Sequence, residues 1–159
     1  VSGKMEVISE ELKSLMRRFP LGVAVVTTKW RDKLVGMTVN TFNSLSMSPP
    51  LVLFLADRTR GNDVPFRESE FFSVNLTDDK DILNTFAVSP VETRFRKVKY
   101  ELEEGVPVLT EAYAYMILRK AQVIDVGDHS IIVGEVIKTR MVRDADPLVY
   151  YDRDYRKIC

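Results

Sequence analysis

The sequence predicts a mostly β protein, a split β-barrel with an N-terminal helix and short peripheral helices. Apolar, β-branched segments outnumber helical ones, and short turns between them favour antiparallel pairing. Six or more such strands suit a closed or nearly closed barrel, which removes its own edges. An OB-like or split barrel therefore fits better than a parallel α/β sheet. We expect residues 1–159 to form a single domain, because this length suits one core.

An amphipathic helix is predicted at the start of the chain. Ser9 is followed by two acidic residues, which is a helix-start signal. Pro20 and Gly22 end the pattern. The apolar residues at helical spacing between these signals are Leu12, Leu15, Met16 and Phe19.

Strand-forming segments account for most of the remaining chain. The predicted strands cover residues 22–30, 34–40, 51–56, 71–77, 113–126 and 130–142. The first two are expected to form a hairpin, and the last two are joined by the sequence GDH at 127–129. The segments between them are a loop with one helical turn at 57–69, a short helix after the aspartates at 78–81, an excursion at 89–109 and an aromatic, basic tail at 146–158.

Charge and composition exclude several classes of partner. Lys plus Arg equals Asp plus Glu at 23 each, so no overall field draws in nucleic acid or an anionic membrane. Apolar runs are far shorter than the roughly 20 residues of a membrane span. Residues 5–19 are charged and helical in pattern, unlike a signal peptide. We therefore expect a cytoplasmic protein that binds neither nucleic acid nor membrane.

Several motifs of known chemistry are missing from the sequence. There is no GxGxxG, GxxxxGK[ST], HExxH or CxxC pattern. One histidine, His129, and a distant terminal cysteine, Cys159, make no metal site, so no metal is expected. A Ser or Thr nucleophile would depend on that single histidine, and no elbow motif frames one. Hydrolysis is thus not expected.

Polar side chains interrupt the β pattern between residues 38 and 48 and indicate a binding surface. The hydroxyl and amide residues of this stretch are Thr38, Asn40, Thr41, Asn43, Ser44 and Ser46. Hydroxyls and adjoining backbone N–H groups can donate to phosphate oxygens or to the rim of a heteroaromatic ring. A polar loop that follows a strand has the same composition, and both interpretations stay open here.

Arg58, Thr59 and Arg60 form a second candidate group, directly after the strand at 51–56. In a barrel they could emerge at the same end as the polar stretch. Two guanidiniums that flank a hydroxyl suit a phosphate, because Arg binds such groups bidentately. The alternative is a solvated, charged loop.

His129 and the C-terminal aromatics complete the candidates. A lone imidazole at a turn can donate a hydrogen bond at a ligand mouth or supply a proton, or it can be structural. The tail gathers tyrosines and arginines that could stack on or pair with a nucleotide, or pack on the barrel or across a dimer interface. These tail residues are Tyr150, Tyr151, Arg153, Tyr155 and Arg156.

Five stretches in order carry a resemblance to a known family. They are RRFPLGVAVVTT (17–28), GMTVNTFNSLSMSPPLVLF (36–54), FFSVNL (71–76), GDHSIIVGEV (127–136) and PLVYYDRDYRKI (147–158). Together they resemble the flavin reductase family, the reductase components of two-component flavin-dependent monooxygenases such as 4-hydroxyphenylacetate 3-monooxygenase. The resemblance implies a homodimeric, FMN-binding split barrel that reduces FMN or FAD with NADH or NADPH. It also implies a flavin-dependent oxygenase partner that receives the reduced flavin by diffusion.

The resemblance also implies roles for individual residues. Around the isoalloxazine it places Thr38, Val39, Asn40 and Thr41. Near the ribityl chain or the phosphate it places Ser44, Ser46, Arg58, Thr59 and Arg60. Toward the nicotinamide nucleotide it places His129, Tyr151, Tyr155 and Arg156, of which His129 positions the nicotinamide.

Two other functions remain as alternatives. A flavin-binding electron carrier on the same fold would take electrons from a protein donor and keep its flavin. An OB-like module would bind nucleic acid through aromatics and Arg in a basic groove. The net charge of zero and the lack of a dense basic and aromatic strand argue against this second alternative.

Overall fold

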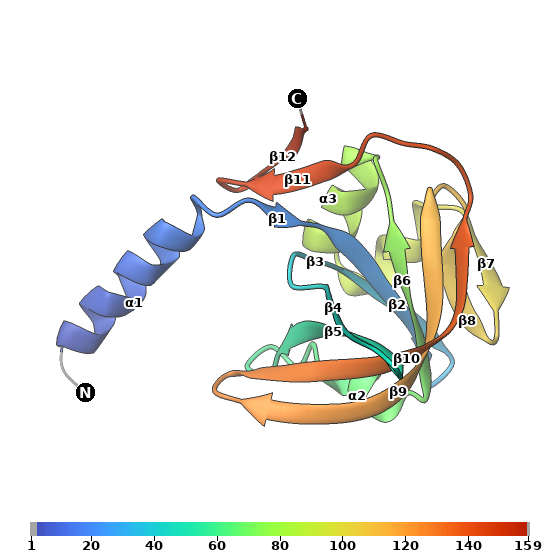
Figure 1. Ribbon diagram of the computed structural model, residues 1–159, viewed down its shortest axis with the longest axis horizontal. Helices are drawn as coiled ribbons and strands as arrows, with labels where there is room; N and C mark the ends of the chain where they lie inside the picture. The colour runs from blue at the N-terminus through green and yellow to red at the C-terminus, as the bar shows by residue number, and fades with distance from the viewer. Residues whose placement is uncertain (1–2, 159) are drawn as a thin grey trace.

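The computed structural model describes residues 3–158, and β-strands form most of the body (Figure 1). The strands are β1 (Leu21–Gly22), β2 (Ala24–Trp30), β3 (Lys33–Val39), β4 (Asn43–Met47), β5 (Pro50–Asp57), β6 (Phe71–Leu76), β7 (Tyr100–Glu103), β8 (Val106–Leu109), β9 (Ala114–Val126), β10 (His129–Met141), β11 (Leu148–Tyr151) and β12 (Asp154–Lys157). The helices are α1 (Gly3–Met16), α2 (Val64–Glu68), α3 (Lys80–Val88) and the 3₁₀ helix η1 (Val91–Arg96). This content confirms the mostly β prediction with an N-terminal helix and short peripheral helices.

A seven-stranded antiparallel sheet forms the split barrel. Its strand order is β3-β2-β6-β9-β10-β5-β4, and every neighbouring pair is antiparallel. The two edge strands, β3 and β4, are consecutive in the chain and are joined by residues 40–42. The curled sheet therefore returns to its own start at these residues without a hydrogen-bonded pair between its edges. This opening lies within the polar stretch at 38–48.

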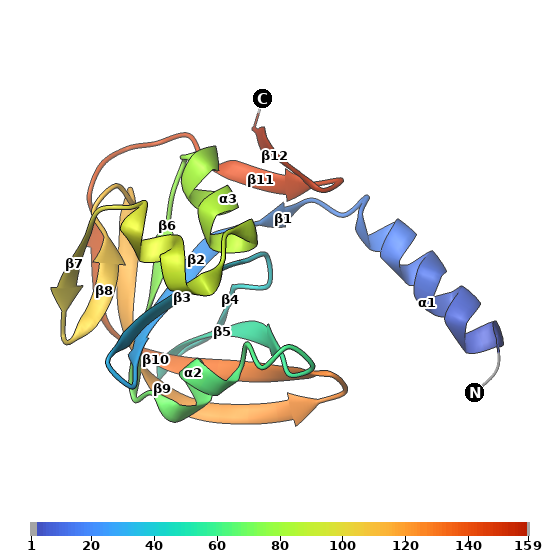
Figure 2. The ribbon, with the colours of Figure 1, turned by 180° about the vertical axis from the view of Figure 1, so that it is seen from behind.

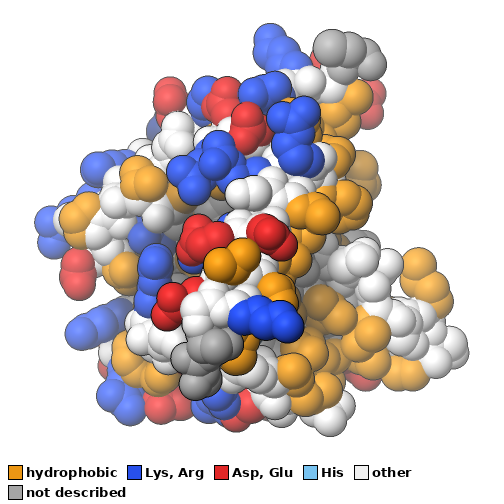
Figure 3. Space-filling view, turned by 90° about the vertical axis from the view of Figure 1, so that its left-hand side faces the viewer, with side chains coloured by type: hydrophobic (Ala, Val, Ile, Leu, Met, Phe, Trp, Pro, Cys, Tyr) orange, Lys and Arg blue, Asp and Glu red, His pale blue; other side chains and the backbone are white. Residues whose placement is uncertain are grey.

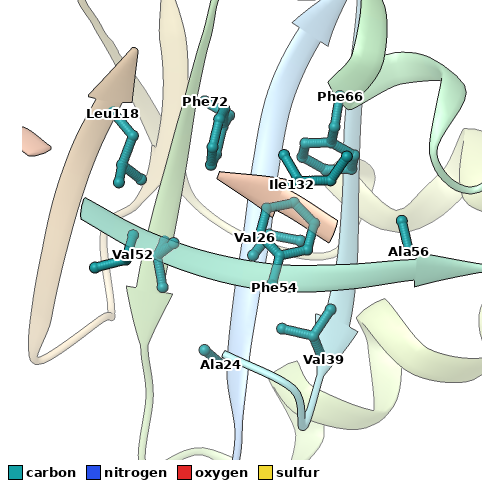
Figure 4. Close-up of a cluster of buried hydrophobic side chains, with 11 residues drawn as sticks. Ala24, Val26, Val39, Val52, Phe54, Ala56, Phe66, Phe72, Leu118 and Ile132 are labelled. Carbon is teal, nitrogen blue, oxygen red and sulfur yellow. The ribbon is translucent and has the colours of Figure 1, made fainter. Parts of the chain in front are cut away.

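Three phenylalanine rings hold the centre of the barrel (Figure 4). Phe54 of β5, Phe66 of α2 and Phe72 of β6 pack edge to face, with ring centroids 5.1, 5.5 and 6.0 Å apart. All three side chains are fully buried, and such aromatic pairs add about 0.5–1.5 kcal/mol each beyond burial of their area. They fix α2 against the barrel, although this helix has only 5 residues.

A second cluster anchors α3 and the C-terminal tail. The Asp79 carboxylate caps α3 by accepting from the backbone N–H groups of Asp81 and Ile82, as the aspartates before this helix predict. The apolar face of α3 packs on Leu148 of β11. The tail forms a hairpin, β11–β12, and β1 pairs with β11 in register Leu21↔Tyr150. Both α3 and this hairpin thereby reach the opening of the barrel.

The N-terminal helix differs from its prediction in position and in contacts. It begins at Gly3 rather than at Ser9, and none of its residues is buried. Figures 1 and 2 show it projecting away from the body, so its apolar stripe packs against nothing in the described chain. Of the helices within residues 3–158, none is long and apolar enough to span a membrane. Cys159 lies outside the described residues.

Candidate functional site

A cavity of about 280 Å³ opens where the barrel is split. The end of β3 and the following loop form one wall, the end of β5 the floor, and His129 with the β11–β12 hairpin the opposite side. Of the residues that the sequence offers as candidates, those that line this cavity are Thr38, Val39, Asn40, Thr41, His129, Tyr150 and Tyr155. The structure thus brings together residues from three distant parts of the chain.

Two threonine hydroxyls at the cavity form hydrogen bonds to the backbone of neighbouring elements. Thr38 Oγ1 donates to the carbonyl of Leu83 at 2.7 Å and ties β3 to α3. Thr41 Oγ1 accepts from the backbone N–H of Leu55 at 3.0 Å, across the opening to β5. The proton of Thr38 is therefore occupied, whereas Thr41 keeps its own proton for a ligand.

Several polar atoms of side chains at the cavity have no hydrogen-bond partner in the described part of the chain. The Asn40 amide, the Nε2 atom of His129 and the hydroxyls of Tyr150 and Tyr155 all lack one within residues 3–158. The rings of Tyr150 and Tyr155 lie 5.6 Å apart, and burial raises the pKa of Tyr155. The chain therefore presents donors and acceptors to the cavity that it does not use for its own folding.

His129 lies between two aspartates. Its Nδ1 is 2.7 Å from Oδ1 of Asp128, and β10 pairs it with Asp57 of β5. Hydrogen bonds from the hydroxyl and the backbone N–H of Thr59 lower the pKa of Asp57, and His129 and Arg60 lower it further. Asp57 is consequently a carboxylate at the cavity at neutral pH.

The predicted phosphate-side residues lie outside the cavity. Ser44 and Ser46 are on the edge strand β4. Arg58 binds the carbonyl of Gly127 at 2.8 Å, and the Thr59 hydroxyl donates to Asp57. Arg60, whose side chain is 80% exposed, lies 3.7 Å from Asp57. Arg58, Thr59 and Arg60 belong to the loop after β5, whereas Ser44 and Ser46 pair with the first half of that strand. The part of these five residues in binding a phosphate stays a prediction.

Tyr151 and Arg156 face away from the cavity lining. The guanidinium of Arg156 lies 5.0 Å from the centre of the Tyr151 ring, and that of Arg18 lies 5.8 Å from it. Both distances are within the range of cation–π contacts. These two predicted residues thus join the tail hairpin to the chain after α1.

A second cavity of about 390 Å³ adjoins the first. The two share Asn40, Thr41 and Tyr150 in their linings. The second is otherwise largely apolar and runs between the end of α1 and the β11–β12 hairpin, where Arg17 pairs with Asp152 at 2.9 Å. A ligand larger than the first cavity can extend along this side.

Sequence reasoning missed several residues of the first cavity. Those that the structure adds are Val23, Met37, Leu55, Ala56, Asp57, Asn62 and Ala87. Asp57 precedes the Arg58 group, so its position along the chain was a signal. Ala87 and Asn62 carry no signal, because only tertiary packing brings α3 and the loop before α2 to the opening.

Comparisons with known proteins agree with this architecture. The flavin reductase like domain matches residues 16–159. FMN reductase (NADH) SmoA of Agrobacterium fabrum is 36% identical over 144 residues, which cover 89% of this chain and 82% of that relative. The reductase component of 4-nitrophenol 4-monooxygenase/4-nitrocatechol 2-monooxygenase of Rhodococcus opacus is 29% identical over 143 residues, 89% of this chain and 76% of that one.

A solved structure extends the agreement to three dimensions. The crystal structure of flavin reductase HpaC complexed with NADP⁺ is 56% identical, covers 94% of this chain and 97% of its own, and superposes with a TM-score of 0.93. The family match spans nearly the whole chain and includes every wall of the cavity. The chain therefore belongs to the flavin reductase family.

Proposed function

We propose that this protein is an NAD(P)H:flavin oxidoreductase. It transfers hydride from NADH or NADPH to FMN or FAD and supplies the reduced flavin to a partner flavin-dependent monooxygenase. The observation that carries the proposal is the convergence of unused polar groups, from Asn40, His129, Tyr150 and Tyr155, on one cavity at the barrel opening. Membership of the family supports it, as do the names of the NADH-dependent relative and of the monooxygenase reductase component.

The chemistry of the cavity fits a flavin. A flat heteroaromatic ring needs an apolar floor with donors and acceptors at its rim. Met37, Leu55 and Ala56 supply apolar surface, while Asn40 and Thr41 supply rim groups from the connection between β3 and β4. The adjoining second cavity leaves room for further parts of a nucleotide. The residues present therefore suit this cofactor class.

The work of the protein in this reaction is positioning. Bound flavin and nicotinamide supply the redox chemistry themselves. The chain holds the Asn40 amide and the Thr41 hydroxyl at the rim, where donors stabilise negative charge as it develops. His129, held through its Nδ1 by Asp128, keeps Nε2 directed to a ligand and places the nicotinamide. Tyr150 and Tyr155 line the cavity, and a ligand that lies against them displaces water from it.

Oxidation of reduced nicotinamide is the direct test of this function. The absorbance of NADH or NADPH would be followed with purified protein while FMN or FAD is titrated from zero. We expect oxidation that rises and saturates with flavin, and the comparison of all four pairs identifies the preferred cofactors. No oxidation with any pair would overturn the proposal, and flavin retained through gel filtration would then indicate an electron carrier.

We further propose that the protein works as a homodimer in the cytoplasm. Helix α1 leaves Leu12 57% exposed and Leu15 65%, and Phe19, which follows the helix, is 55% exposed. Figure 3 looks onto the face from which this helix projects and shows hydrophobic side chains uncovered there. A stripe of this kind on an unpartnered helix marks an interaction surface, and a two-fold dimer covers it with a second copy. The proposed use of NADH or NADPH as hydride donor supports the cytoplasmic location.

A further inference from the structure

An arginine on the short helix α2 binds the end of the β9–β10 hairpin. Arg67 Nη2 donates to Oδ1 of Asp125 at 2.6 Å and to the hydroxyl of Ser130 at 2.8 Å. Its Nε donates to Oδ2 of Asp63 at 3.1 Å, and Asp63 is only 6% exposed. Phe66, the preceding residue, is fixed in the core. Arg67 thereby ties the two hairpin strands to a rigid element.

A second arginine binds the other oxygen of the same carboxylate. Arg58 Nη1 lies 3.3 Å from Oδ2 of Asp125, and Arg58 Nη2 donates to the carbonyl of Gly127 at 2.8 Å. The backbone N–H of Arg58 donates to the carbonyl of Asp128 at 2.9 Å. Both carbonyls of the two-residue turn thus accept from Arg58. We call Arg58, Arg67 and Asp125 the arginine clasp.

Charge reinforces the arginine clasp. The hydrogen bond from Arg67 is the main cause that lowers the pKa of Asp125, and the same bond raises the pKa of Arg67. The Ser130 hydroxyl also donates to Asp125, at 2.7 Å. The carboxylate is therefore charged and bound on both oxygens at neutral pH, and charge-assisted bonds of this kind are stronger than neutral ones.

The arginine clasp and the side chain of His129 lie on opposite faces of strand β10. Side chains alternate along a strand, so the buried Ser130 faces the clasp and His129 faces the opposite side, where it lines the cavity. The imidazole Nδ1 in turn contacts the carboxylate of Asp128, in the turn that Arg58 holds. None of the three clasp side chains lines the cavity itself.

We propose that the arginine clasp is the positioning device for His129. Arg58 fixes the Gly127–Asp128 turn and Arg67 fixes the strand residues on either side of it, Asp125 and Ser130. Together they fix the orientation of the imidazole and hence the place of the nicotinamide ring. The clasp members are positioning residues that act through His129, and Arg58 serves here as a structural anchor of the turn. The inference rests on the proposed function, in which His129 places the nicotinamide.

Steady-state kinetics of Asp125→Asn and Arg67→Gln test the proposal. Both variants remove a charge from the clasp, and Asp125→Asn does so at nearly constant side-chain size. We expect kcat/KM for the reduced nicotinamide to fall about tenfold, mainly through KM, because misplacement of a reacting group costs rate. The flavin dissociation constant should stay at the wild-type value. If Arg67→Gln fails to fold, Asp125→Asn alone decides the outcome.

A double-mutant cycle separates action through His129 from general loosening. In the His129→Ala background, Asp125→Asn should cause no further fall in kcat/KM, because its path of action is already removed. An equal, additive fall in both backgrounds would overturn the proposal. Arg31→Gln is the matched control: it removes an Arg–carboxylate pair between the β2–β3 turn and Glu68 of α2, at 3.1 Å, away from the hairpin. It should leave kcat/KM unchanged.

A spectroscopic readout is independent of enzyme activity. His129 is the only histidine, so a ¹H–¹⁵N spectrum of the imidazole reports it alone. At pH 8 the wild type should show mainly the tautomer with Nδ1 protonated, since that atom faces Asp128. Both clasp variants should move toward the mixture of a free imidazole. An unchanged spectrum in folded variants would overturn the clasp, whereas failure of NADH oxidation alone would overturn only the proposed function.

Discussion

The Asn40 amide is a polar group that the fold leaves for a ligand. It lines both cavities and has no hydrogen bond within residues 3–158. Asn40→Ala should therefore raise the flavin dissociation constant about three- to tenfold, the worth of one hydrogen bond. The denaturation midpoint should not change. Fluorescence quenching of FMN measures the affinity, with Asn43→Ala on β4 as control. Equal affinities for wild type and Asn40→Ala would contradict the role.

The size of the fall in kcat/KM on substitution of His129 distinguishes a positioning role from proton transfer. A general acid contributes about 10²–10⁴-fold, whereas a group that only places the nicotinamide contributes less. We expect His129→Ala to lower kcat/KM for NADH or NADPH about tenfold, to leave flavin affinity unchanged and to retain turnover. Complete loss of activity in a folded variant would assign the imidazole to proton transfer. Stopped-flow reduction of bound flavin measures the step directly.

Strand β10 passes so close to the core that one position requires glycine. A Cβ on Gly134 would lie 2.6 Å from Cζ of Phe72 and 3.0 Å from Cβ of Leu118. Phe72 belongs to the packed ring triad, so it has little room to move. Gly134→Ala should thus cost about 1–3 kcal/mol of unfolding free energy, by overpacking. Urea unfolding checks this against Gly22→Ala, where the added Cβ meets no atom within 4 Å.

An element could be predicted from the sequence when its signal lay in neighbouring residues. The site residues at 38–41 and the capped helix α3 were visible because hydroxyls, amides and an Asp N-cap act on neighbouring residues. The hairpin β11–β12 was hidden: its turn residues, Asp152 and Arg153, adopt positive φ of 50° and 63° without the Gly or Asn that usually indicates such a turn. Helix α1 begins before Ser9 because the Lys4–Glu6 segment favours helix as well.

Tertiary contacts determine the features of the site that the sequence did not predict, such as the partners of Arg58 and the position of Ala87. The Arg58 group followed a strand and suggested a phosphate contact, yet its guanidinium lies against Asp125 and the carbonyl of Gly127. Those partners are more than 60 residues away, and the β5–β10 pairing alone brings them together. Ala87 reaches the cavity for a similar reason, through the packing of α3 on β3.

Ion pairs across the whole molecule make its stability depend on acid pH. Hydrogen bonds from Arg143, Lys80 and Lys138 are the main causes that lower the pKa values of Asp78, Asp154 and Glu103, respectively. Within residues 3–158, the pKa values of Asp57, Glu68 and Asp125 are lowered as well. Because each folded-state pKa lies below the unfolded one, these carboxyls stabilise the fold fully above the unfolded values, near pH 4.

The free energy of unfolding should therefore be level between pH 7 and 5 and fall as the pH drops through 4 toward 3. Protons then bind the unfolded chain first, and the stabilisation is lost completely only below the folded-state pKa values. Urea unfolding at pH 7, 5 and 3 measures the slope. Asp78→Asn should make it shallower, and a slope of the opposite sign would contradict the assignment.

Helix α1 exposes an apolar stripe that no other part of residues 3–158 covers. Its apolar residues recur at steps of three and four, from Met5 through Ile8, Leu12 and Leu15, and all are more than half exposed. In a homodimer this stripe is covered, so Leu12→Glu should shift the protein from dimer to monomer, because a buried charge without a partner is costly. Ser14→Glu, on the opposite face, should leave the dimer intact. Sedimentation equilibrium measures both, and a wild-type monomer would contradict the proposed homodimer.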